Sequence, residues 1–165
     1  MLIRIERPDD AGAIRDVVRA AFEGDSEAGL IECLRADGDL ILSLAAELDG
    51  RVVGHIGFSR LWIEHGGQRS PGVSLAPLAV TPELQHRGIG SALIEAGHVR
   101  LVEARETLAF VYGSPVYYGR FGYSLAAAAP FACVYAGQYF QALAFSAQAP
   151  TTGTVEYAPA FAGVE

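Results

Sequence analysis

The chain has 165 residues, with 12 positively charged side chains, all of them arginine, against 19 acidic ones, for a net charge of −7. The absence of lysine excludes a Walker-type phosphate loop, Schiff-base catalysis and protein-kinase chemistry, and the absence of asparagine excludes N-glycosylation. Because phosphate contacts dominate nucleic-acid affinity, an acidic chain without a basic cluster is not expected to bind nucleic acid.

The length fits one domain over residues 1–165, and the sequence holds no apolar run of the ~18 residues that a membrane span needs. The N-terminus lacks the pattern of a signal peptide. Cys33 and Cys133 lie in apolar surroundings without a CxxC neighbour, and the four histidines have no ligand spacing. We therefore predict two buried free thiols, no metal site, no membrane contact and a cytoplasmic location.

The first forty residues predict one strand and two helices. Residues 2–5 alternate between apolar and polar side chains, which is typical of a strand. Pro8 and two aspartates begin a helix whose apolar residues recur at helical spacing to Phe22. An acidic loop over residues 23–27 then leads to a second helix, and Gly38 is expected to end it.

Residues 39–48 and 51–63 are apolar runs joined by Asp49-Gly50, the strongest short hairpin signal. A turn at residues 65–68 introduces a strand at 72–80, and a helix then runs to about residue 105. A strand at 108–112, a helical turn at 115–121 and two alternating patches at 140–145 and 154–157 complete the order. This order indicates an α/β (α+β) fold with a mixed sheet.

The segment from Leu78 to Ser91 is the most informative about chemistry, because a strand, a glycine-rich turn and a helix N-terminus follow one another. Backbone N–H groups at such a terminus are unpaired, and the helix dipole favours an anion there. The glycines admit a phosphate close to the backbone, and Arg87 adds a cation. We interpret the segment as a pyrophosphate cradle, with an ordinary glycine-rich turn as the alternative.

Two motifs resemble those of one family. Gln85-x-x-Gly88-x-Gly90 resembles the acetyl-CoA signature Q/R-x-x-G-x-G/A of the GNAT N-acetyltransferase superfamily, and PVYYGRFGY, which ends at Tyr123, resembles its YYxRFGF element. The second motif is similar to that of a bacterial branch of predicted N-acetyltransferases. The resemblance covers the whole chain and implies the GNAT fold, a mixed central sheet of about six to seven strands flanked by about four helices.

The resemblance implies acetyl-CoA as the co-substrate. Leu78 and Val80, with Ala79 between them, are expected to pair with the pantetheine arm and to polarise the thioester carbonyl. The pyrophosphate is expected to bind the backbone of the following segment, which comprises Gln85, His86, Arg87, Gly88, Ile89, Gly90 and Ser91. Many family members carry an asparagine before the next helix, and in its absence Ser114 or a water is expected to contact the cofactor.

By position, Tyr118 matches the family tyrosine that contacts the cofactor and commonly protonates the departing CoA thiolate. The alternative for Tyr118 is a packed aromatic ring with a satisfied hydroxyl, and Tyr117 is expected in the core. The reaction implied is direct transfer of an acetyl group to a primary amine in a ternary complex. A ping-pong route through Cys33 or Cys133 is a weaker variant.

The general base is left open, because the strand over residues 73–77 has no carboxylate where many family members carry a glutamate. The candidates are His55, Glu64, His65 and Glu27. Histidine suits this role because it ordinarily titrates near neutrality. The junction after the first helix usually borders the acceptor pocket in this family. A cationic small-molecule or peptide amine is expected to bind there, at Phe22, Glu23 and Glu27. The alternative is a solvated loop with a helix cap at Asp25 or Ser26.

Three questions stay open at this stage. The same fold without catalysis would give an acyl-CoA-binding sensor or partner protein, and the missing strand carboxylate favours that alternative. A longer acyl chain in place of acetyl is a further variant. The apolar C-terminal third offers a surface for a homodimer.

Overall fold

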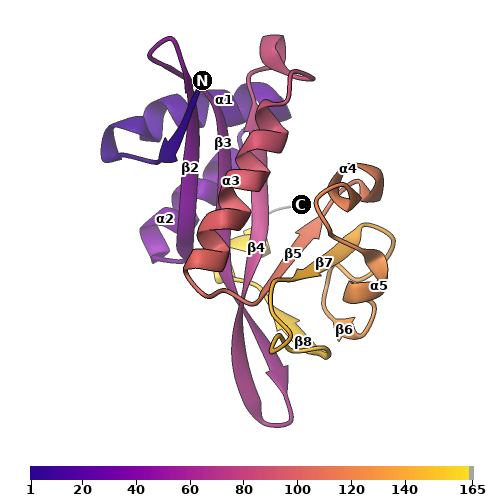
Figure 1. Cartoon of the computed structure of the whole chain (residues 1–165). Helices are drawn as coiled ribbons and strands as arrows, with labels where there is room; N and C mark the ends of the chain where they lie inside the picture. Colours follow the sequence, from indigo (N-terminus) through magenta and orange to yellow (C-terminus); the bar gives the residue numbers. More distant parts are fainter. Residues whose placement is uncertain (164–165) are drawn as a thin grey trace. The chain divides into compact units, whose positions relative to one another are not determined.

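The computed structural model describes residues 1–163, and contacts group the chain into two compact units. Of the described residues, unit 1 comprises 1–59, 76–99 and 159–163, and unit 2 comprises 60–75 and 100–158. The chain therefore passes repeatedly from one unit to the other, and neither unit is one continuous stretch (Figure 1). A single domain over residues 1–165 stays a prediction.

In unit 1, three strands form an antiparallel arrangement: β1 (Leu2–Ile5) pairs with β2 (Leu40–Leu48), and β2 pairs with β3 (Arg51–His65). The β2–β3 turn is the predicted one, with φ of 52° at Asp49 and 75° at Gly50, because a two-residue hairpin turn of this type needs positive φ at both positions. The last part of β4 (Gln68–Val80) also belongs to this unit and is a neighbour of β3.

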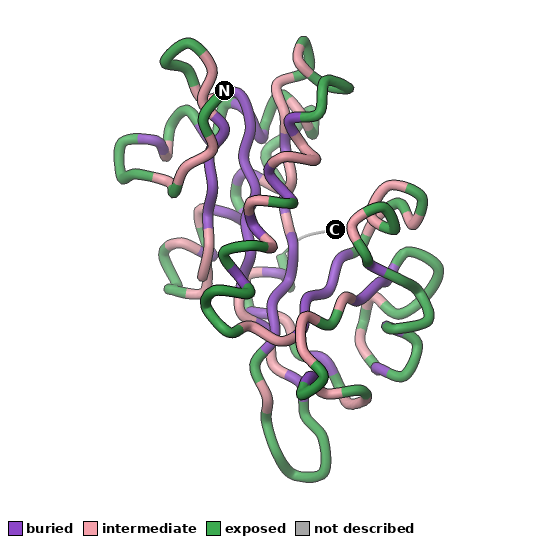
Figure 2. Tube along the Cα trace, in the orientation of Figure 1, coloured by how far each residue is buried: buried purple, intermediate pink, exposed green. Residues whose placement is uncertain are grey.

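Helices cover both faces of β3 in unit 1. They are α1 (Ala11–Phe22), α2 (Ser26–Asp37) and most of α3 (Ile89–Glu103), and a 3-10 helix at Pro8–Asp10 precedes α1. A Cβ at Gly54 would lie 3.1 Å from atoms of α3, and one at Gly57 would lie 2.8 Å from Ile31 of α2. Positions three apart in a strand face opposite sides, so α3 and α2 pack on opposite faces. Figure 2 shows the buried residues following these strands.

In unit 2, β5 (Leu108–Tyr112) lies between β4 and β7 (Phe140–Ala144), parallel to the first and antiparallel to the second. β8 (Gly153–Glu156) pairs with the end of β3 and with the short β6 (Phe131–Ala132). The core of this unit contains a stack of aromatic rings: Phe110 lies parallel to Phe140 at 5.2 Å and edge-on to Phe131 at 5.1 Å. Two short helices, α4 (Pro115–Gly119) and α5 (Leu125–Ala128), complete the unit.

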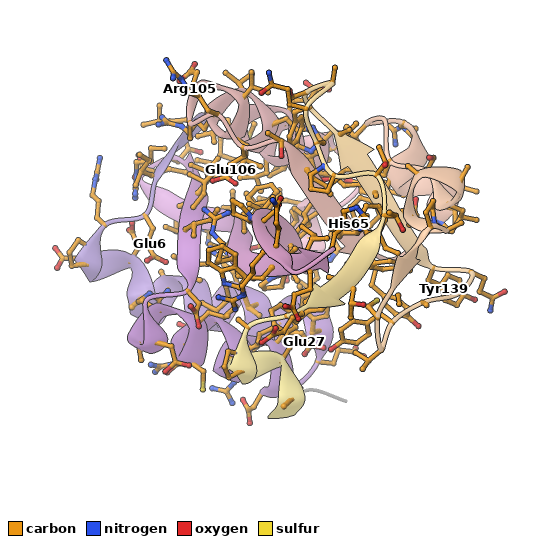
Figure 3. All side chains as sticks on the ribbon, turned by 90° about the horizontal axis from the view of Figure 1, so that it is seen from below. Glu6, Glu27, His65, Arg105, Glu106 and Tyr139 are labelled. Atoms are coloured by element: carbon orange, nitrogen blue, oxygen red, sulfur yellow. The ribbon has the colours of Figure 1, made fainter. Side chains whose placement is uncertain are left out.

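Arg60 forms a bidentate ion pair that holds the segment before β5 against β3 and β4. The guanidinium of Arg60 donates two hydrogen bonds of 2.8 Å to the carboxylate of Glu106 and one of 3.1 Å to the carbonyl of Gly72. Arg105 points outward whereas Glu106 turns inward (Figure 3). A bidentate, part-buried pair of this kind is geometrically specific, and it joins β3, β4 and the segment before β5.

The predicted order of elements is confirmed, with two additions. Within residues 1–163 the structure has eight strands and five α-helices, compared with the predicted six to seven and four. The additional β6 and α5 have two and four residues, which is too short for a periodic pattern to reveal. A final 3-10 helix follows at Pro159–Gly163. No helix in the described part of the chain is long and apolar enough to cross a membrane.

The cysteine prediction is half correct. Both thiols are free, but Cys33 is exposed and Cys133 is half-buried. Cys33 lies two residues after Ile31, which is buried in the core of unit 1. Residues two apart on a helix face different sides, so the apolar sequence around Cys33 did not bring it into the core.

The packing of α3 on β3 generates a stability prediction. A Cβ at Gly97 would lie 2.6 Å from Cε2 of Phe58, which is fully buried. We expect Gly97→Ala to lower the free energy of unfolding by about 1–3 kcal/mol, because the ring has no room to move. Gly29→Ala is the matched control, since a Cβ there meets nothing within 4 Å, and we expect it to raise stability by about 0.5–1 kcal/mol. Urea unfolding measures both changes in the free energy of unfolding. Equal changes in the two variants would contradict the close packing of Gly97 against Phe58.

Candidate active site

The turn after β4 forms the start of an anion cradle in unit 1. A 3-10 helix at Pro82–Leu84 follows the strand, and α3 begins at Ile89. Two residues adopt left-handed backbone conformations, His86 with φ of 65° and Gly88 with φ of 87°, and a Cβ at Gly88 would meet nothing within 4 Å. The residues from Gln85 to Gly88 are exposed. The first-turn N–H groups of α3 have no acceptor within the helix, so they are suited to an anionic ligand.

Gln85 makes two hydrogen bonds within the cradle, and its predicted contact with the pyrophosphate stays a prediction. Its N–H donates to the carbonyl of Pro82 at 3.3 Å, and its side-chain amide donates to the carbonyl of Val80 at 3.0 Å. Gln85 therefore ties the cradle to the end of β4. The residues from His86 to Ser91 are left as candidate anion donors.

The last residues of β4 present backbone groups along one edge. The parallel pairing with β5 covers Val73–Leu75 alone, although β4 continues to Val80. The N–H of Thr81 donates to Val53 of β3 at 2.8 Å. Because backbone groups alternate in direction along a strand paired in this way, those of Leu78 and Val80 point away from β3. This is the orientation that pairing with an extended ligand requires, while the Ala79 side chain is buried in the core of unit 1.

In unit 2, Tyr118 lies in α4 and its ring packs against Gly113. A Cβ at Gly113 would lie 2.7 Å from Cε2 of Tyr118, so only glycine fits beneath the ring. The rings of Tyr117 and Tyr123 flank it edge-on, at 5.0 and 6.0 Å. Burial raises the pKa of Tyr118 to about 12, with a smaller contribution from Tyr117. Its hydroxyl is therefore protonated at neutral pH, as a proton donor must be.

The sequence reasoning missed Gln141, a positioning residue and the second residue of β7. It is fully buried, and its amide nitrogen donates to the carbonyls of Gly113 at 3.0 Å and Tyr139 at 3.4 Å. The N–H of Gly113 donates in turn to the carbonyl of Tyr139 at 3.0 Å. These bonds fix the backbone on which Tyr118 rests. A glutamine within the apolar run Phe140–Ala144 was the available signal, because a buried amide needs specific partners.

Ser114 and Tyr117 have local roles. The hydroxyl oxygen of Ser114 accepts a hydrogen bond from the N–H of Tyr117 at 3.3 Å and so caps α4. Its hydroxyl hydrogen is still able to donate to another group. Tyr117 is half-buried, not a core residue as expected, and its ring contacts Phe121 at 5.5 Å and the guanidinium of Arg120 at 5.6 Å.

The comparisons with known proteins agree with this geometry. Residues 3–126 match a family model described as an acetyltransferase (GNAT) domain. The chain is also 39% identical over 162 residues to the uncharacterized N-acetyltransferase YhbS of Escherichia coli K12, covering 95% of this chain and 96% of that protein. The chain belongs to the GNAT acetyltransferase family.

Two solved GNAT structures are similar over nearly the full length. One is a GNAT family acetyltransferase from Brucella melitensis in complex with acetyl-CoA, with a TM-score of 0.82, 39% identity and 97% coverage of both chains. The other is YhbS from Escherichia coli in complex with CoA, with a TM-score of 0.89, 36% identity and coverage of 98% of this chain and 91% of that one. These relatives confirm the predicted GNAT fold.

The geometry of His55 in this GNAT chain does not favour direct base catalysis. The residue is fully buried in β3, with Nε2 2.7 Å from the hydroxyl of Ser43, which donates to Glu6 at 3.0 Å. Burial opposes ionisation of Glu6, but hydrogen bonds from Arg35 and Ser43 outweigh it and lower the pKa of the carboxyl. An ionised Glu6 accepts the Ser43 proton, so Nε2 of His55 carries hydrogen and Nδ1, which has no partner, is the free acceptor.

The other candidate bases lie on different parts of the GNAT fold. Glu64 and His65 are exposed at the β3–β4 hairpin, which precedes the start of β4. Since β4 and β5 are parallel, the hairpin and the end of β5 lie at opposite ends of these strands, and Tyr118 follows the end of β5. Glu27 is half-buried in the first turn of α2. The base stays a prediction that only activity can test.

The predicted acceptor region borders an open hollow of about 450 Å³ at the end of α1, with Glu23 in its lining. Phe22 is 41% exposed beside it. Asp25 is exposed at the N-cap position of α2 and forms a 2.6 Å ion pair with Arg19, but its side chain makes no capping hydrogen bond. Binding of an amine by Phe22, Glu23 and Glu27 stays a prediction. The described residues contain no group of three or more side chains arranged to hold a metal.

The buried histidine predicts a pH dependence of stability. Burial lowers the pKa of His55 from 6.5 to about 4, so the unfolded chain binds the extra proton between these values. The free energy of unfolding therefore falls as the pH is lowered from about 6.5 toward 4, by at most about 1.4 kcal/mol per pH unit for one histidine. Above about pH 6.5 this contribution no longer changes with pH. We expect His55→Gln to flatten the dependence of the unfolding free energy on pH.

Urea unfolding at a series of pH values between about 5 and 7 measures this slope. His86→Gln, which changes an exposed histidine of the cradle, is the control and should leave the slope unchanged. An unaltered slope in His55→Gln would contradict the lowered pKa of His55; burial also lowers the pKa of His98 to about 4, so part of the slope is expected to remain in the variant.

Proposed function

We propose that this protein is an acetyl-CoA-dependent N-acetyltransferase that acetylates a primary amine by direct transfer in a ternary complex. The observation that carries the proposal is the open cradle at the start of α3, with Gly88 at a φ of 87°, in a chain 39% identical to an acetyltransferase solved in complex with acetyl-CoA. Similarity to CoA-bound relatives and the backbone geometry of the cradle support the same co-substrate.

Several groups of this chain fit the parts of acetyl-CoA. The N–H groups from His86 to Ser91 suit the pyrophosphate, because the helix dipole favours an anion at that end, and Arg87 adds a positive charge. The outward-facing backbone groups of Leu78 and Val80 suit the pantetheine arm, which carries amides that can pair like an added strand. The net charge of −7 opposes a polyanion only weakly, since short-range donors dominate over screened, distant charges.

In the proposed reaction, the neutral amine nitrogen attacks the thioester carbonyl carbon. The C–N bond forms, the C–S bond breaks and the sulfur keeps the bonding pair. Tyr118 donates its hydroxyl proton to that sulfur, and the nitrogen releases its extra proton to a base or to water, from which the tyrosinate is reprotonated. Burial raises the pKa of Tyr118 to about 12, so its hydroxyl is protonated at neutral pH, but it is also a weaker acid than an ordinary tyrosine.

A second candidate function is acyl-CoA binding without catalysis, as a sensor or partner subunit. Two observations favour it: β4 carries no carboxylate over residues 73–77, and His55 is fully buried. A protein of this kind would bind acetyl-CoA tightly and release no thiol from it in the presence of any amine.

Substitution of Tyr118 tests the proposed acid. We expect Tyr118→Phe to lower kcat for amine-dependent release of CoA thiol by ~10²–10⁴-fold, the usual contribution of a general acid, with acetyl-CoA affinity unchanged. Tyr117→Phe is the matched control and should retain activity. Equal activity of Tyr118→Phe and wild type would show that Tyr118 is a packed aromatic ring and not the general acid. Tight acetyl-CoA binding by wild type without thiol release across a panel of amines would favour the sensor.

Removal of both thiols tests direct transfer. We expect the double variant Cys33→Ala, Cys133→Ala to retain wild-type turnover, because no acetyl-cysteine intermediate is required. Burial also raises the pKa of Cys133, which lowers its thiolate fraction. Activity is measured by mass spectrometry of the acetylated amine. Lost turnover with retained acetyl-CoA binding would establish a ping-pong route.

A further inference from the structure

A second hollow, of about 280 Å³, lies in unit 2, and three of its seven lining residues are tyrosines. We name it the tyrosine hollow and define it by Tyr112, Tyr135 and Tyr139; the rest of its lining is Val134, Ala136, Gly137 and Gln138. Tyr112 is 57% exposed and Tyr139 is 43% exposed. Large aromatic rings held at an accessible concave surface often mark a ligand site.

The fold holds the three rings in a fixed frame. Tyr112 is the last residue of β5 and pairs with Phe140, so Tyr139 immediately precedes the paired residue of β7. The ring of Tyr135 packs edge-on against Tyr157 at 4.8 Å. The Tyr112 ring lies 5.7 Å from each of the rings of Tyr135 and Tyr139, at interplanar angles of 48° and 79°. The edge-to-face contacts cover part of one ring face in each pair, and the exposed surface of Tyr112 and Tyr139 stays accessible to a ligand.

No lysine of this chain is available to cover these ring faces, since the sequence contains none. The arginines that lie over aromatic rings, Arg69 and Arg120, do so at other places, over Trp62, Tyr117 and Phe121. The faces of tyrosine rings carry negative electrostatic potential and attract organic cations.

We propose that the tyrosine hollow binds an organic ammonium cation, such as a quaternary or protonated alkylammonium group. The volume of about 280 Å³ is at the lower limit for small-molecule pockets, which suits a compact head group. Alkylammonium groups bring both a charge for the ring faces and methyl or methylene groups for apolar contact.

The hollow lies beside the segment that carries Tyr118 without including it. Tyr112 and Gly113 are consecutive, and the carbonyl of Tyr139 accepts the hydrogen bond from Gly113. Successive residues of a strand point to opposite faces, and Tyr118 packs on the Gly113 side. The site is thus separate from the proposed acid, and ligand binding can be measured without any acetyl transfer.

The test is an NMR titration of the full-length protein with choline chloride, following the amide signals of Gly113 and Gly137. The matched neutral probe is 3,3-dimethyl-1-butanol, in which a carbon replaces the nitrogen, and sodium chloride controls for ionic strength. We expect saturable shifts with choline at millimolar concentrations and weaker binding of the neutral probe by about fivefold or more. Equal affinity for the two probes, the same shifts with sodium chloride, or no saturation would overturn the proposal.

Variants locate the binding. Tyr139→Ala should weaken choline binding by about fivefold, whereas Tyr139→Phe, which keeps the ring, should bind as wild type does. Tyr117→Ala removes a ring outside the hollow and should have no effect. Thermal unfolding of each variant verifies folding, and Tyr112→Leu provides a second test if Tyr139→Ala is unstable. Unchanged affinity in both ring-removing variants, or an equal loss in Tyr117→Ala, would place the cation elsewhere and refute the proposal.

Discussion

The packing within each unit depends on close approaches at glycine positions. In unit 1, Gly54 and Gly57 on β3 admit side chains of α3 and α2, and Gly97 on α3 admits the ring of Phe58. In unit 2, Gly113 admits the ring of Tyr118. Since interiors are packed as tightly as crystals, a methyl group at Gly97 or Gly113 would clash with a ring, and one at Gly54 or Gly57 would require the neighbouring aliphatic side chains to shift. The position of the proposed acid therefore rests on the absence of one Cβ.

Charge is distributed so that local geometry outweighs the overall excess of acid. Several arginines are engaged with carboxylates, including the part-buried pairs of Arg4 with Asp10 at 2.7 Å and Arg35 with Glu6 at 2.6 Å. Arg87 is exposed at the cradle instead. Main-chain N–H groups need no net charge to bind an anion, and ring faces need none to bind a cation. A chain without lysine can thus offer sites for ligands of either sign.

The buried polar residues are where sequence reasoning was weakest. His55 was one of four candidate bases because histidine ordinarily titrates near neutrality, and the structure shows it fully buried beside Ser43, where burial lowers its pKa to about 4. Gln141 was not singled out at all, yet its amide holds the backbone of Gly113. The partners of such groups are distant in sequence, and burial changes their chemistry, so neither the residue type nor the local pattern reveals the outcome.

The sequence by itself determined the order of most elements, the Asp49-Gly50 turn, the cradle after β4 and the family, because these depend on short-range patterns of apolar residues, glycine and proline. Only the tertiary structure decided that Cys33 is exposed, that Gln85 is tied to Val80, and that Tyr112, Tyr135 and Tyr139 surround one hollow. The physical reason is the same in each case. Exposure, hydrogen-bond partners and ring clusters depend on contacts between residues whose distances in space the sequence pattern does not encode.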